Sequence, residues 1–180
     1  PVAHPGGFTA GRAAFLAEYQ DQQYATRFRE AIAPVRTAEA RISSGTALTE
    51  TAARSLFKLM SYKDEYEVAR LYTDGSFARA LESQFEGDVR LSFHMAPPIL
   101  SKRDKVTGHL LKRRFGSWMM PAFRVLARLK VLRGTAFDIF GYSAERREER
   151  ALVGEFEQVL TQLARTLSEA SLPVAAEIAA

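Results

Sequence analysis

Apolar residues recur every three to four positions along most of the chain, which is the spacing of amphipathic α-helices. The cleanest stripe lies near the C-terminus. It consists of Leu152, Phe156, Val159, Leu160, Leu163 and Leu167. Ser143 precedes this segment as a candidate N-cap, and Pro173 follows it as a stop. The pattern therefore predicts a long helix between these two residues.

Other segments show the same helical spacing, separated by clusters of Gly, Ser and Asp. These segments cover residues 9–19, 21–42, 49–72, 74–86 and 117–133. Thr49 is a candidate N-cap for the long helix through Tyr72, and Thr73-Asp74-Gly75 interrupts the pattern after it. Helices therefore account for most of the chain.

The period changes to two between Val89 and Met95, where apolar residues alternate with polar ones. Such alternation is typical of a half-buried strand, and Pro97-Pro98 ends it. A second extended run ends at Phe115, after the turn-rich segment 104–108, which favours a hairpin. The sequence predicts a mainly α fold with a small antiparallel β hairpin, arranged as a helical bundle of five to six helices.

The expected domain organisation is simple for 180 residues. Residues 1–20, rich in Pro and Gly at their start, are expected to be a lead-in segment that is partly disordered. Residues 21–180 are expected to form a single helical domain, with the β insertion at about 89–115. Because the chain starts at Pro1 and not at Met, we expect it to be a piece of a longer polypeptide.

The amino-acid composition excludes several kinds of site. The chain has no cysteine, which excludes disulfides, thiolate zinc sites and iron–sulfur clusters with cysteine ligands. It shows no signal peptide and no apolar run long enough to cross a bilayer. Together with the reducing compartment that a cysteine-free chain fits, these features predict a cytoplasmic protein.

The net charge of +4 hides an uneven distribution. Between positions 102 and 133 there are ten basic residues and one acid, Asp104, and the remaining positions carry fifteen basic and twenty acidic residues. The basic residues are Lys102, Arg103, Lys105, Lys112, Arg113, Arg114, Arg124, Arg128, Lys130 and Arg133. Such a block attracts an acidic partner by long-range electrostatics, or pairs with acidic helices of its own domain, and the second interpretation is slightly favoured.

Motifs that carry catalysis are absent from the sequence. The histidines, His4, His94 and His109, are far apart and lack metal-ligand spacing. We find no nucleophile elbow, P-loop, dinucleotide fingerprint or thiamine-diphosphate motif. Trp118 and the two methionines after it fit a core or interface better than a cofactor pocket. No catalytic, cofactor-binding or metal-binding residue is predicted.

A charged cluster at residues 63–70 is the second candidate contact surface. Lys63, Asp64, Glu65 and Arg70 fall in a predicted helix, where charged residues usually form a solvated face. An interdomain contact is the alternative interpretation. With Lys112, Arg113, Arg114, Arg124 and Arg128, these four residues are the candidates for contact with a partner or a neighbouring domain.

Several sequence blocks carry a resemblance to a known family. They are residues 62–72 (YKDEYEVARLY), 85–88 (FEGD), 94–98 (HMAPP), 115–119 (FGSWM) and 140–142 (FGY). In these blocks the chain resembles the C-terminal region of the fused indolepyruvate ferredoxin oxidoreductases, within the 2-oxoacid:ferredoxin oxidoreductase family. The resemblance covers nearly the whole chain and is most specific between residues 56 and 152.

The resemblance implies a parent enzyme that oxidatively decarboxylates aryl pyruvates to acyl-CoA and passes electrons to ferredoxin. It implies thiamine diphosphate, magnesium and iron–sulfur clusters for that parent, but none of their sites maps onto this segment. The chain would then be a non-catalytic accessory domain in contact with the catalytic domains of a homo-oligomeric parent, and with an acidic ferredoxin. The alternative function is a free-standing basic helical adaptor that binds nucleic acid or another polyanion.

Overall fold

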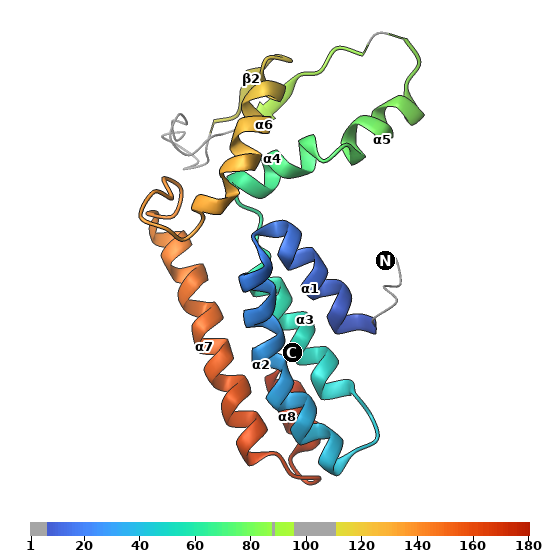
Figure 1. Cartoon of the computed structure of the whole chain (residues 1–180), viewed down its shortest axis with the longest axis vertical. Coiled ribbons are helices and arrows are strands. Elements are labelled where there is room, and N and C mark those ends of the chain that lie inside the picture. The colour runs from blue at the N-terminus through green and yellow to red at the C-terminus, as the bar shows by residue number, and fades with distance from the viewer. Residues whose placement is uncertain (1–6, 88, 96–110) are drawn as a thin grey trace. The chain divides into compact units, whose positions relative to one another are not determined.

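The structure is a computed structural model and describes residues 7–87, 89–95 and 111–180. Over these residues the chain forms eight α-helices, one short 3-10 helix and one two-stranded antiparallel sheet (Figure 1). The mainly α fold with a small β hairpin is therefore confirmed. The described helices exceed the five or six expected because the predicted helix 49–72 is divided and residues 172–178 form a helix of their own.

The chain divides into two compact units where the sequence suggested a single domain. Unit 1 comprises residues 1–63 and 131–180, and unit 2 comprises residues 64–130. Residues from both ends of the chain thus build one unit, with the middle inserted as the other. Hydrophobic periodicity reports which residues are buried but not which helices they are buried against, so it did not reveal this division.

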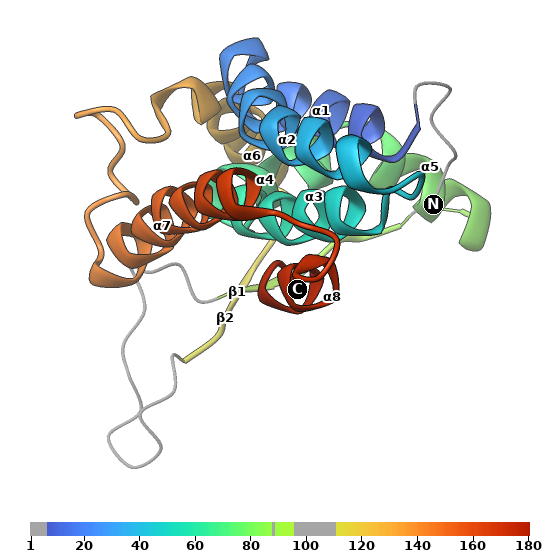
Figure 2. The ribbon, with the colours of Figure 1, turned by 90° about the horizontal axis from the view of Figure 1, so that it is seen from below.

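Unit 1 is a bundle of five helices in which α2 contacts α1, α3 and α7 (Figures 1 and 2). The helices are α1 (Gly7–Tyr19), α2 (Gln22–Ile42), α3 (Ala47–Met60), α7 (Ala144–Thr166) and α8 (Leu172–Ile178). Each helix contributes an apolar stripe to one shared core. Its large, fully buried apolar side chains are Leu16, Tyr19, Phe28, Val35, Leu48, Leu56, Met60 and Leu160.

The expected lead-in segment is a helix of the bundle from residue 7 onward. Ala13, Leu16 and Tyr19 on α1 are buried in the core of unit 1. The Tyr19 hydroxyl also donates a hydrogen bond to the carbonyl oxygen of Tyr62 at 3.0 Å. Residues 1–6 lie outside the described residues. The glycines near the start of the chain therefore do not prevent α1 from packing.

A buried carboxylate fixes the start of α3. The Glu39 side chain, on α2, accepts hydrogen bonds from the backbone N–H groups of Leu48 and Thr49, each at 2.8 Å, and from the Thr49 hydroxyl at 2.6 Å. The N-cap residue itself, Thr46, makes no side-chain cap hydrogen bond. Thr49 was predicted to be the cap, but it lies in the first turn, because Glu39 satisfies the free N–H groups from another helix.

The long helix predicted between Thr49 and Tyr72 is interrupted at residues 61–64. α3 ends at Met60, and α4 (Glu65–Thr73) begins after Asp64. The Asp64 carboxylate accepts a hydrogen bond from the backbone N–H of Glu67 at 2.8 Å, which is the geometry of an N-cap. The cap allows a second helix to start a few residues after the first one ends.

Unit 2 combines three helices and the hairpin. Its elements are α4, α5 (Ser76–Gln84), β1 (Phe93–Met95), β2 (Arg113–Phe115) and α6 (Met119–Arg128). The strands pair antiparallel, with Phe93 opposite Phe115. Phe93, Phe123 and Tyr72 form an aromatic cluster with ring centroids 5.2 Å apart. The predicted turn 104–108 lies outside the described residues, which resume at 111 and soon lead into β2.

Candidate docking surfaces

Several residues of the charged cluster at positions 63–70 stabilise α4 itself. Asp64 is buried and caps the helix, and Glu67 is buried with its carboxylate bound by Arg70 through two hydrogen bonds of 2.8 Å. Glu65 is partly buried, whereas Lys63 is exposed. Asp64 and Arg70 thus have structural roles within unit 2, and the contact of this cluster with another domain stays a prediction.

The basic candidates of unit 2 are exposed. They are Lys112, Arg113 and Arg114 in and beside β2, and Arg124 and Arg128 on α6. In the described part of the chain their one polar side-chain contact is a 3.1 Å hydrogen bond from Arg114 Nε to Ser92 Oγ. Pairing of these five cations with acidic helices of the same domain is therefore not seen among the described residues.

The remaining basic residues of the block fall into other settings. Lys102, Arg103 and Lys105 lie outside the described residues. Arg133 is buried in unit 1, where its Nη1 donates to the carbonyl oxygen of Tyr19 at 2.7 Å and its guanidinium lies 3.8 Å from the centroid of the Tyr19 ring. The block that looked continuous in the sequence is therefore divided between structural and surface positions.

α6 has a second apolar stripe that the sequence analysis missed. The inner stripe of α6 packs in the unit 2 cluster, with Phe123 buried and Met119, Leu126 and Ala127 partly buried beside it. Trp118, the N-cap residue, Val125, on the helix, and Leu129, the C-cap residue, are 63%, 59% and 40% exposed. Their i, i+7, i+11 spacing was the available signal, but the inner stripe already accounted for an amphipathic helix.

The loop at residues 134–142 of unit 1 exposes large apolar side chains that the sequence analysis did not single out. Asp138 is buried at its centre and accepts hydrogen bonds from the backbone N–H groups of Gly134, at 2.8 Å, and Gly141, at 3.1 Å. Arg150 donates to both the Asp138 carboxylate and the Gly141 carbonyl oxygen. A Cβ atom at position 141 would collide with the Asp138 carboxylate, so the loop requires glycine there.

The residues on either side of Asp138 in the sequence are exposed to solvent. Phe137 is 75% exposed and Ile139 is 62% exposed. Tyr142 is also exposed, with its hydroxyl bound to the carbonyl oxygen of Ala136 at 2.6 Å. The loop therefore presents large apolar side chains from a backbone that a buried carboxylate holds in place.

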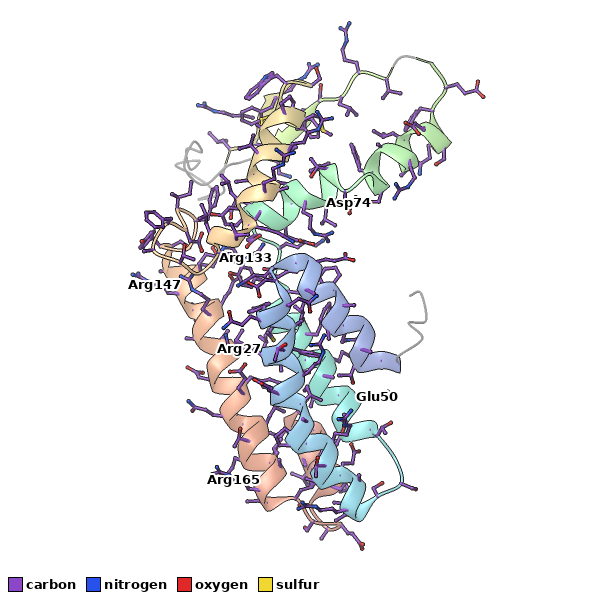
Figure 3. The ribbon with its side chains drawn as sticks, in the orientation of Figure 1. Arg27, Glu50, Asp74, Arg133, Arg147 and Arg165 are labelled. Atoms are coloured by element: carbon purple, nitrogen blue, oxygen red, sulfur yellow. The ribbon has the colours of Figure 1, made fainter. Side chains whose placement is uncertain are left out.

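Unit 1 contains a cavity of about 280 Å³ lined by arginine and tyrosine side chains, of which Arg27 and Arg133 are labelled in Figure 3. It is lined by Gln20, Tyr24, Arg27, Tyr62, Arg133, Gly134, Arg150 and Val153. Arg27 is bound by both carboxylate oxygens of Glu157, at 2.7 and 2.9 Å. Burial is the main cause that raises the pKa of Tyr24 to about 12, with a further contribution from Tyr62. Each arginine here is bound to a protein acceptor, so these cations stabilise the bundle.

The described residues contain no group of three or more His, Cys, Asp or Glu side chains that could hold a metal ion. His94 is exposed on β1, and the other two histidines lie outside the described residues. No helix in the described ranges has the length and apolar character needed to cross a membrane.

Comparison with known proteins gives one positive result. Neither the curated proteins nor the solved structures contain a match to the chain. A family profile, described as a family of unknown function (DUF6537), matches residues 8–180, which is nearly the whole chain. The chain belongs to this family, DUF6537.

Proposed function

We propose that the chain is a non-catalytic accessory domain that assembles with the catalytic domains of an indolepyruvate:ferredoxin oxidoreductase-like enzyme. The sequence blocks at residues 62–72, 94–98 and 115–119 support this relationship. The parent would convert aryl pyruvates to acyl-CoA in the cytoplasm, as a homo-oligomer. Its thiamine diphosphate, magnesium and iron–sulfur clusters would be held by other segments of the polypeptide.

The apolar loop of unit 1 is the observation that carries an assembly role. Exposed Phe and Ile side chains are unfavourable in water by roughly 1.5–3 kcal/mol each relative to burial. Here Phe137 and Ile139 flank the buried Asp138, whose hydrogen bonds oppose collapse of the loop onto the bundle. A protein surface that covers both side chains would recover this free energy, and the catalytic body of the parent is the surface we propose.

Expression of the whole encoded polypeptide tests the proposal. The purified protein should contain thiamine diphosphate and iron–sulfur clusters and should oxidise indolepyruvate in the presence of coenzyme A. The double substitution Phe137→Ser/Ile139→Ser should disrupt assembly in size-exclusion chromatography. Val174→Ser, at an exposed apolar position of α8, is the matched control and should leave assembly intact. A polypeptide without these cofactors or this activity would refute the proposal.

Docking of an acidic ferredoxin is the proposed role of the cations at β2. Reversing Lys112, Arg113 and Arg114 to Glu in the whole polypeptide should slow ferredoxin reduction, because these residues are exposed and attract negative charge at a distance. Reduction of a small neutral dye should continue at the original rate. Equal rates with ferredoxin would remove this role and leave the assembly role untouched.

The basic adaptor is the second candidate function, favoured by the exposure of the same cations. Titration of the chain with duplex DNA at low and moderate salt separates it from the first. Tight binding that weakens steeply with salt would favour the adaptor, because released counterions drive phosphate binding. Weak binding with a shallow salt dependence would favour the accessory domain.

A further inference from the structure

α6 packs one apolar side into the core of unit 2, and its other apolar side is largely exposed, with the Trp118 ring in edge-on contact with Phe115 at 5.9 Å between centroids. On the inner side Phe123 is buried, stacked on Tyr72 with an interplanar angle of 11°. On the outer side Trp118, Val125 and Leu129 are exposed. Trp118 is the N-cap residue of α6, Val125 lies on the helix and Leu129 is its C-cap residue. These three exposed side chains, which we call the outer stripe, are therefore spread along the length of α6.

Cations flank this stripe. Arg124 and Arg128 are exposed on α6, one helical turn apart, so they lie on the same edge of the stripe. Nearby in the chain, Lys112 and Arg113 are exposed in and beside β2. In the described ranges these four cations form no ion pair with a carboxylate. The outer side of α6 thus combines an apolar centre with a basic edge, which we call the α6 outer face.

The composition of the α6 outer face selects among classes of partner. Trp and Arg are the residues that most often dominate binding energy at protein interfaces, in an apolar centre with a polar rim. Phosphate binding needs the cations but gives no role to Val125 and Leu129. Membrane binding grows with the apolar area buried in the lipid interface, and residues 118–129 offer only three large exposed apolar side chains for it. A protein with carboxylates around an apolar patch matches both parts of the face.

We infer that the α6 outer face docks a second, acidic protein, with Trp118, Val125 and Leu129 in the buried centre and Arg124 and Arg128 against its carboxylates. This face belongs to unit 2, whereas the loop assigned above to the catalytic body belongs to unit 1. If the partner is the ferredoxin of the proposed parent, the inference deepens that proposal. Any other acidic protein leaves the inference intact and removes ferredoxin docking.

Site-specific crosslinking in cells identifies the partner. The photoreactive residue p-benzoylphenylalanine is placed at position 125 or 129 of the whole encoded polypeptide, and at position 155 of α7 as an exposed control. Positions 125 and 129 should capture one acidic protein that position 155 does not capture. Crosslinks only to other segments of the same polypeptide, to lipid or to nucleic acid would overturn the inference, as would no crosslink above the control.

Titration of the captured protein, once purified, gives the decisive measurement. Trp118 is the single tryptophan of the chain, so its emission reports directly on the α6 outer face. Binding should shift this emission to shorter wavelength, because the partner removes the indole from water. Arg124→Glu/Arg128→Glu should weaken binding at least about tenfold, since close interfacial charge pairs couple strongly.

The matched control reverses two exposed arginines of α7, Arg147→Glu/Arg165→Glu, which carry the same change in charge (Figure 3). This variant should bind within about twofold of the unsubstituted chain, because charges away from the contact act only through screened long-range attraction. Equal weakening by both variants would mean general charge attraction, and would overturn the docking site. So would binding that leaves the Trp118 emission unchanged.

Discussion

The arginines of the unit 1 cavity and those of α6 have the same side-chain chemistry but differ in their hydrogen-bond partners. In unit 1, Arg27 binds both oxygens of Glu157, and Arg150 binds Asp138 and the Gly141 carbonyl oxygen. On α6, Arg124 and Arg128 are exposed, and no described residue accepts a hydrogen bond from their side chains. A protein acceptor within hydrogen-bond distance, and not the density of basic residues along the sequence, decides whether a cation stabilises the fold.

This difference has an energetic consequence. Removing one member of a buried charge pair leaves the other member unsatisfied, which costs several kcal/mol, whereas exposed pairs contribute about 0–1 kcal/mol. Loss of the buried Asp138 carboxylate should therefore lower stability, whereas loss of the Arg27–Glu157 pair, in which the arginine side chain is 47% exposed, should change stability little. Substitutions on the α6 outer face should change binding and leave stability nearly constant. Four measurements test this difference between unit 1 and unit 2.

Loss of the Asp138 carboxylate should have the largest effect. Asp138→Ala removes the acceptor for the N–H groups of Gly134 and Gly141 and the carboxylate partner of Arg150. We expect the free energy of unfolding to fall by about 3 kcal/mol, measured by urea titration with circular dichroism. Asp138→Asn keeps one acceptor oxygen and should cost less. A loss below about 1 kcal/mol would show that the loop does not depend on this network.

Alkaline pH should lower the stability of unit 1, because the partly buried Tyr24 hydroxyl ionises. Its hydroxyl donates to the carbonyl oxygen of Met60 at 3.1 Å, and burial is the main cause that raises its pKa to about 12. An unfolded chain ionises tyrosine near pH 10, so stability is intact below about pH 10 and falls as the pH rises toward 12. The loss attributable to Tyr24 should reach about 2 kcal/mol.

Tyr24→Phe isolates this contribution. At pH 8 the variant should be less stable by about 1 kcal/mol, because the hydrogen bond to Met60 is lost. Between pH 10 and 12 its stability should fall less steeply than that of the unsubstituted chain. Urea unfolding at a series of pH values measures both slopes. Parallel slopes would assign the alkaline transition to other groups.

Asp64 should show a smaller effect, in unit 2. Asp64→Ala removes the N-cap of α4 and should lower the free energy of unfolding by about 1 kcal/mol. Lys63→Ala, at the exposed neighbour, should change it by less than about 0.5 kcal/mol. Thermal unfolding followed by circular dichroism distinguishes the two. Equal, negligible effects of the two substitutions would show that the Asp64 cap does not stabilise α4.

The sequence predicts helices whose N-cap residue and apolar stripe lie close together in the chain. α7 begins after Ser143, whose hydroxyl accepts a hydrogen bond from the Arg146 N–H. The inner stripe of α6 packs in the unit 2 cluster, with Phe123 buried and its other members partly buried. α2 likewise begins after Asp21, whose carboxylate accepts from the Tyr24 N–H. In each case the cap and the periodic stripe lie within a few residues of each other, so the pattern contains all the information needed.

Features that depend on distant residues were not predictable in this way. Glu39 caps α3 from another helix, and Arg150 reaches back to Asp138 from twelve residues away. Both contacts exist only after the helices have packed. Of the candidate contact residues, the sequence located the exposed cations of unit 2. It did not separate them from Arg133, because charge density along the chain does not report burial.

Charge reversal on α6 should have the smallest effect on stability. Arg124→Glu/Arg128→Glu keeps two like charges one turn apart, so their mutual repulsion is unchanged. Arg128 lies in the last turn, where a cation complements the helix dipole, and its reversal should cost a few tenths of a kcal/mol. The total change in the free energy of unfolding should stay within about 0.5 kcal/mol, measured by urea titration. Arg124→Ala/Arg128→Ala removes the repulsion without adding acids and should be at least as stable as the reversed variant. If either variant lost more than about 1 kcal/mol, the α6 cations would be structural, and the contrast with the unit 1 arginines would fail.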